Sequence, residues 1–202
     1  PIWRGPTPGQ DNHDCNWFVI SEVLYDYDSV SGGGDTGHEF IEIAGAAGAY
    51  LENVQVSSIQ GSSSSAGSVI DSDIISTLRM PGNGLYVLAD QTSSGQTEVA
   101  NADEIVDLQF QNGPDAIQLL RVTASSGTTY FDSFGYGSLT PNLTDLSHMQ
   151  PAYEGTPVPD LSTRIRPITW ARDSNQTDTQ NNAADFSFDP SPTPGQPNLP
   201  SE

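Results

Sequence analysis

The sequence predicts an all-β protein, an antiparallel β-sandwich of seven to nine short strands with a long Pro-rich C-terminal segment. The 19 Gly and 15 Pro among 202 residues disfavour long helices and require frequent turns. Runs in which apolar and polar residues alternate recur along the chain, and such runs argue against disorder. The last fifty residues are polar and rich in Pro, so long strands are not expected there.

The rest of the chain is organised around one pair of predicted strands joined by an Asp- and Gly-rich loop. In the first strand, Phe18, Ile20, Glu22 and Leu24 alternate with the residues between them. This period of two is typical of a strand with one face in a core. The second strand, residues 39–43, is rich in β-branched and aromatic side chains. Further strands are expected to add to this pair.

The runs that follow predict the remaining strands. Residues 85–89 are almost continuously apolar, which is typical of a strand buried on both faces. The turn at 112–115 predicts a hairpin between the strands on either side of it. The remaining predicted strands are, in order, 51–59, 85–89, 105–110, 116–120, 129–136 and the short candidate 163–166.

The polar C-terminal segment carries three widely spaced aromatic side chains, Trp170, Phe186 and Phe188. We expect them to anchor this segment along an edge of the sandwich and so to shield that edge from association. Two packed antiparallel sheets of immunoglobulin type are the simplest arrangement that buries the predicted strands.

The charge of the chain limits its partners. Six basic residues, all of them Arg, stand against 26 acidic residues, which gives a formal net charge of −20. This field repels phosphate backbones, so nucleic acid is not an expected partner. No apolar run approaches the roughly 18 residues of a membrane span, so membrane insertion is not expected either. The acidic, Lys-free surface favours solubility in salty water and an extracellular or cell-surface location.

Some of these carboxylates could instead bind divalent cations, which prefer oxygen ligands. The best candidate is the loop of residues 26–39, where Asp26, Asp28, Asp35 and Glu39 surround consecutive glycines. The hypothesis is a calcium site, and the alternative is a solvated acidic loop. A second, weaker metal candidate is the group Asp173, Asp178, Asn181, Asn182 and Asp185.

Residue patterns for catalysis are missing. The histidines, His13, His38 and His148, have no helical metal-binding spacing, and no Gly-x-Ser-x-Gly segment occurs. Carboxylates are so abundant that their presence does not indicate glycoside chemistry. Cys15 is the one cysteine, so it is either buried or paired with another copy or a neighbouring domain. The sequence therefore predicts a protein that is not an enzyme.

A short segment near the N-terminus recurs at the C-terminal end of the chain. Residues 6–12, Pro-Thr-Pro-Gly-Gln-Asp-Asn, match residues 192–198, Pro-Thr-Pro-Gly-Gln-Pro-Asn, at six of seven positions. A repeat at domain length suggests a tandem array in which residues 1–14 are the tail of a preceding unit. Trp3 would then anchor this arm on a neighbour, and Cys15 would lie at the junction. The alternative is a coincidence between two Pro-rich turns.

Several short pieces, in one order along the chain, resemble the lamin tail domain. The resemblance implies an immunoglobulin-like β-sandwich, closest to bacterial members that occur in secreted or surface proteins. It supplies no catalytic residues, and the chain lacks the coiled-coil rod and the basic surface of nuclear lamins. The matching pieces are 19–23, 39–43, the Pro-Gly turn before 85–90, 115–119, 131–137, 161–164 and 192–198.

These observations divide the chain into an arm (1–14), a lamin-tail-like sandwich (15–198) and a terminal linker (199–202). The function expected is that of a non-catalytic extracellular or cell-surface module for protein association. Its partners would be other protein copies or neighbouring domains, in a homo-oligomer, tandem array or fibre, with calcium as the one candidate cofactor. The alternative is an accessory carbohydrate-binding domain of a secreted enzyme, in which Trp3, Trp17 and Trp170 would stack on sugars instead of packing in a core.

Overall fold

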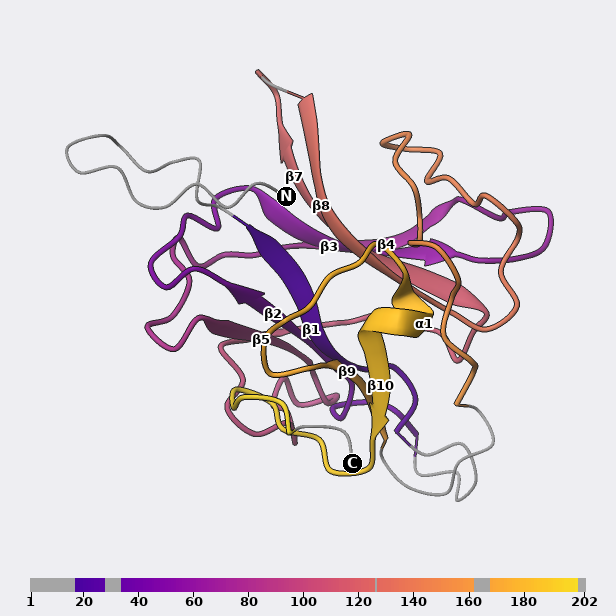
Figure 1. Cartoon of the computed structure of the whole chain (residues 1–202). Coiled ribbons are helices and arrows are strands. Elements are labelled where there is room, and N and C mark those ends of the chain that lie inside the picture. Colours follow the sequence, from indigo (N-terminus) through magenta and orange to yellow (C-terminus); the bar gives the residue numbers. More distant parts are fainter. Residues whose placement is uncertain (1–16, 28–33, 126, 162–167, 200–202) are drawn as a thin grey trace.

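Two β-sheets pack face to face in the part of the chain that the computed structural model describes, residues 17–27, 34–125, 127–161 and 168–199. The strand order is β10-β9-β1-β2-β5-β6 in the larger sheet and β4-β3-β7-β8 in the smaller one (Figure 1). The predicted all-β sandwich is confirmed. The elements are β1 (Phe18–Leu24), β2 (Phe40–Gly45), β3 (Val54–Gln60), β4 (Val69–Ile74), β5 (Leu85–Asp90), β6 (Glu104–Val106), β7 (Asp115–Thr123), β8 (Gly127–Tyr136), β9 (Thr169–Arg172), α1 (Asn182–Asp185) and β10 (Phe186–Asp189).

The described residues form ten strands, against the seven to nine expected, because β4, β9 and β10 were not predicted as strands. β4 lies at a sheet edge and contains Asp71 and Asp73, and Asp is depleted in strands, so its sequence does not indicate one. β9 and β10 form where the anchors Trp170 and Phe186 are buried, whereas Phe188 is half-exposed. The strand candidate 163–166 lies outside the described residues.

The predicted hairpin between residues 105–110 and 116–120 is wrong. β6 belongs to the larger sheet and pairs in parallel with β5, whereas β7 lies in the smaller sheet. Acidic side chains hold this stretch against β5. The Val87 N–H donates to Asp103 Oδ2 (2.9 Å), and the Leu108 N–H donates to Asp90 Oδ1 (3.0 Å). These long-range bonds override the local turn signal at 112–115.

A β-bulge in β1 changes which of its side chains face the core. Ile20 pairs with Ile43 of β2, but the next paired residue is Glu22, opposite Glu42. The extra residue, Ser21, shifts the alternation by one, so that Val23 and not Glu22 follows Ile20 in the main core. Ser21, Glu22 and Glu42 therefore lie on the face of the larger sheet that the smaller sheet does not cover.

That second face is covered by the C-terminal part of the chain. Residues 192–198, called the closing segment below, lie along β1 and β2 (Figure 1, yellow). They cover Ser21, Glu22 and Glu42, whereas Leu24 and Phe40 on these strands pack against Val99 and Ala102. Every residue of β1 and β2 is therefore buried, although the sequence predicted only one buried face for the first strand. No helix among the described residues is long and apolar enough to cross a membrane.

Candidate functional site

The predicted calcium loop is described in part. Asp26 and Glu39 are buried at the two ends of the loop, and Asp35 Oδ1 accepts a hydrogen bond from the Tyr27 N–H (2.9 Å). Asp28 lies outside the described residues. The three described carboxylates lie near one another but do not form a group whose ligand atoms are all within 4.8 Å. Calcium at this loop stays a prediction.

Glu39 is a buried and strongly perturbed carboxyl group at the end of this loop. It is 3% exposed, and its Oε1 has no hydrogen-bond partner in the described part of the chain. Burial, followed by the charges of Asp35, Asp90 and Asp26, raises the pKa of Glu39 to about 10. Glu39 therefore carries a proton at neutral pH, and it could hold calcium only after losing that proton.

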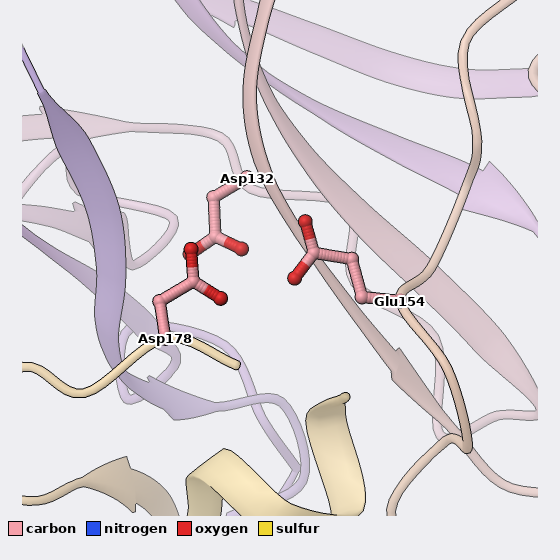
Figure 2. Close-up of side chains that lie close together, drawn as sticks. All are labelled: Asp132, Glu154 and Asp178. Carbon is pink, nitrogen blue, oxygen red and sulfur yellow. The ribbon is translucent and has the colours of Figure 1, made fainter. Parts of the chain in front are cut away.

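A different group of carboxylates has the spacing of metal ligands. One oxygen each of Asp132, Glu154 and Asp178 lies within 4.8 Å of the other two. Figure 2 shows the three side chains pointing toward one another from separate parts of the chain. Among the described residues, this is the one group of three with that spacing.

The guanidinium of Arg172 is already bonded to this cluster. Arg172 is 1% exposed, and its Nη2 donates to both oxygens of Asp132 (2.9 and 3.1 Å). Its Nη1 lies 3.3 Å from Asp185 Oδ2 and 3.7 Å from Asp178 Oδ1. Its Nε and Nη1 also donate to the carbonyl groups of Ile20 and Thr177. Arg172 thus supplies a positive charge to at least three carboxylates.

Asp132 has little capacity left for a metal ion. Besides Arg172, the Ile20 N–H donates to its Oδ2 (2.7 Å) and the Ser133 N–H donates to its Oδ1 (2.8 Å). A divalent cation would have to displace Arg172 or bind beside its charge, which is unfavourable in a buried site. The residues present fit a structural ion-pair network better than a calcium site.

Glu154 completes the cluster as a neutral group. It is 5% exposed, its Oε1 accepts a hydrogen bond from the Tyr130 hydroxyl (2.6 Å), and its Oε2 has no partner among the described residues. Burial, followed by the charge of Asp132, raises the pKa of Glu154 to about 8. At neutral pH Glu154 therefore mostly holds its proton, which relieves the excess of negative charge.

The second metal candidate from the sequence is brought together only in part. Asp178 and Asp185 do lie around Arg172, but Asp173 caps its own turn by accepting from the Thr177 N–H (2.8 Å). The two asparagines act as structural links: Asn181 accepts from the Thr156 N–H, and Asn182 bonds to backbone groups of 133, 135 and 154. The sequence did not indicate that Asp132, Glu154 and Arg172 form a site, because the three are far apart along the chain. The one signal in the sequence was Asp132, a charged residue inside the aromatic run 130–136.

The closing segment is held by a second polar site, formed by Ser21, Glu22 and Glu42, all of them fully buried. The Thr193 N–H donates to both oxygens of Glu22 (3.1 and 3.2 Å), and the Thr193 hydroxyl donates to Oε2. The Gly195 N–H donates to Glu42 Oε2 (2.7 Å), while the Ser21 hydroxyl donates to Oε1 of the same carboxyl group (2.7 Å). Two facing glutamates therefore bind the backbone of the closing segment.

Asn198 completes these contacts. Its Nδ2 lies within hydrogen-bond distance of the Ser21 carbonyl and hydroxyl oxygens (both 3.1 Å) and of the Arg172 carbonyl (3.0 Å). The Ser21 hydroxyl also donates to Glu42, and the Arg172 guanidinium donates to Asp132. Asn198 therefore links the closing segment to the centre of the larger sheet.

The electrostatics of this site depend on burial. Burial raises the pKa of Glu22 and raises that of Glu42 to about 7, against the hydrogen bonds that favour their charged forms. The two carboxyl groups lie opposite each other in the β1–β2 pair, so the charge of Glu22 adds to the shift of Glu42. A proton on Glu42 at neutral pH lowers the repulsion between them.

An open groove of about 340 Å³ borders the closing segment. Its lining is mainly apolar and includes Tyr27 and His38, whose rings stack at 3.8 Å. Pro192 and Pro194 of the closing segment form part of its wall. The groove thus depends on the closing segment being in place.

The predicted interaction residues Trp3 and Cys15 lie outside the described residues. Of the other tryptophans, Trp170 is buried in the core, as expected, while Trp17 is 44% exposed. Phe188 is also exposed. It pairs with Trp170, which in turn pairs with Val23 of β1. Val23 is six residues from Trp17, which places Phe188 about 20 Å from Trp17 along the strand direction. These two aromatic side chains do not form the row that would favour carbohydrate binding.

Comparisons of the chain with protein-family models, with curated proteins and with solved structures find no match.

Proposed function

We propose that this chain is a non-catalytic structural module for protein association, lamin-tail-like and extracellular or on a cell surface, and one unit of a tandem array or fibre. The observation that supports this most is the closing segment. The segment that completes the sandwich has a near-copy at residues 6–12, one domain length upstream. An array of such units would place one closing segment after each sandwich.

The use of the buried carboxylates supports a structural role. Asp90 accepts from the Gly37 N–H (2.6 Å), Asp115 from the Gly61 N–H (2.6 Å) and Asp132 from the Ile20 N–H (2.7 Å). Each of these bonds joins segments more than fifty residues apart. These acidic groups therefore stabilise the framework, and they are not directed at the groove beside the closing segment.

Sedimentation velocity on the full chain over a range of concentrations tests the proposed function. At low salt the charge of −20 opposes contact between copies, and salt screens this repulsion within about 10 Å at 0.1 M. We expect species of two or more copies whose fraction grows with protein concentration and with added sodium chloride. A chain that stays monomeric at millimolar concentration and high salt would contradict the proposal.

A further inference from the structure

The geometry points to a binding site for a second copy of this chain. Ser21, Glu22 and Glu42 form a receptor for the segment Pro-Thr-Pro-Gly-Gln-x-Asn, and residues 6–12 of a second copy fill it when the receptor's own closing segment is displaced. This inference rests on the proposed function, because it names the partner and the site through which copies associate.

The positions that the receptor contacts are the positions that repeat. Its polar contacts are made to Thr193, Gly195 and Asn198. At the common offset of 186, these correspond to Thr7, Gly9 and Asn12. Residues 6–12 therefore carry a counterpart of each residue of the closing segment that the buried glutamates and Ser21 bind.

The single mismatch falls where the receptor makes no contact. Pro197 of the closing segment is exposed, and Asp11 occupies the corresponding place in the upstream copy. A carboxylate at this position would remain in water, at little cost. The difference between the two segments is thus compatible with one receptor.

Glycine is required at the centre of the segment. Gly195 has a φ of +75°, and a Cβ there would lie 2.6 Å from the Cβ of Asn101. Asn101 and Asn83 also donate to the carbonyl groups of Pro194 and Gly195, contacts that any backbone of this shape can accept. Gly9 meets the same requirement in the upstream copy.

The adjoining groove favours the same segment. Pro192 and Pro194 form part of its wall, and Pro6 and Pro8 stand at the corresponding positions upstream. Proline fixes φ near −65°, so either segment loses little backbone freedom on docking. In the closing segment the chain turns at Pro194 and Gly195, where the Gln196 N–H donates to the Thr193 carbonyl (2.9 Å), and Pro8-Gly9 supplies the same residue types for such a turn.

A second copy presents the matching set of acceptors. In a chain whose own closing segment is in place, residues 6–12 are a surplus ligand. Exchange replaces one set of contacts by an equivalent set, but the tethered segment has an effective concentration on the order of millimolar. Binding by the second copy therefore dominates once the receptor's own segment is weakened. Such a head-to-tail contact is heterologous, so each copy can bind the next and the contact can propagate.

The test uses the full chain with its own closing segment disabled by Thr193→Ala, Gly195→Ala and Asn198→Ala. We expect this open-site variant to form dimers and larger species in sedimentation velocity at concentrations where the unaltered chain does not. A synthetic peptide of residues 1–14 should dissociate them, and the same peptide with Gly9→Ala should need at least a tenfold higher concentration. Adding Thr7→Ala, Gly9→Ala and Asn12→Ala to the variant should abolish the association.

A folded open-site variant that stays monomeric would overturn the inference, as would equal potency of the two peptides. If the variant does not fold, amide hydrogen exchange of the unaltered chain with and without the peptide tests the same site. Excess peptide should speed exchange of the Thr193 and Gly195 amides at least tenfold, and no acceleration would overturn the inference. If the peptide displaces the closing segment but the chain never self-associates, the binding site for residues 6–12 is supported and the proposed function is contradicted. If the chain self-associates but the peptide does not displace the closing segment, the proposed function is supported and the inferred binding site is contradicted.

Discussion

Replacing Arg172 by Met should be among the most destabilising single changes in this protein. The substitution keeps an unbranched side chain but removes the charge, together with the bonds to both oxygens of Asp132. Asp132 is fully buried, so its carboxylate is left without its ion-pair partner. Breaking a buried pair by removing one partner costs about 3–5 kcal/mol. We expect a loss of that size in the free energy of unfolding.

The loss should depend on pH, and its sign follows from the pKa of Asp132. Burial raises this pKa, while Arg172 lowers it, and the balance is a value of about 6. Without Arg172 the pKa of Asp132 rises further, so the folded state holds the proton to higher pH. A raised pKa in the folded state stabilises at low pH and loses that stabilisation as pH rises through it. The deficit of the variant should therefore be smaller at pH 5 than at pH 8.

Urea unfolding at pH 5 and pH 8, followed by far-ultraviolet circular dichroism, measures both effects. Arg79→Met is the matched control, because Arg79 is exposed and stacks on Tyr50, so its loss should cost at most about 1 kcal/mol. Combining Arg172→Met with Asp132→Asn should restore part of the stability, since the buried charge of Asp132 is then removed, but not all of it, because Asp185 still lacks its partner. Equal losses for Arg172→Met and Arg79→Met, or a deficit that does not change with pH, would refute the argument.

Three further predictions concern the closing segment, its glutamates and calcium. Gly195→Ala should lower the free energy of unfolding by about 1–3 kcal/mol, because the left-handed backbone and the contact with Asn101 both oppose a Cβ. A urea midpoint equal to that of the unaltered chain would exclude this strain. The pKa of Glu42 is raised to about 7, so protonated Glu42 stabilises the fold fully below pH 4.5, and this stabilisation is lost as the pH rises through 7. Glu42→Gln should therefore reduce the fall in the free energy of unfolding between pH 5 and pH 8 by about 2 kcal/mol, and an unchanged pH profile would show that Glu42 is charged at pH 5. Millimolar calcium should raise the melting temperature, and Asp26→Asn with Asp35→Asn should remove that rise. A melting temperature of the unaltered chain that does not respond to calcium would contradict a calcium site at this loop.

The amino-acid sequence by itself determined the β character of the chain and the position of most strands. Period-two alternation and Gly- and Pro-rich turns are local signals, so β1, β2, β5, β7 and β8 could be recognised without the structure. The importance of the closing segment was also visible, because its repeat is a property of the sequence alone. The site that binds it could not be seen, since a bulge at Ser21 reverses the alternation expected for Glu22.

Only the tertiary structure decided which distant residues meet. Asp132 lies in β8, Arg172 in β9 and Glu154 in the loop between them, and nothing in their spacing along the chain indicates that they share one buried network. The parallel pairing of β6 with β5 likewise depends on acceptors such as Asp90, which binds backbone groups 53 and 18 residues away. Local sequence patterns set the tendency to form strands, whereas pairing, register and the placement of buried charges depend on long-range contacts that a local pattern does not encode.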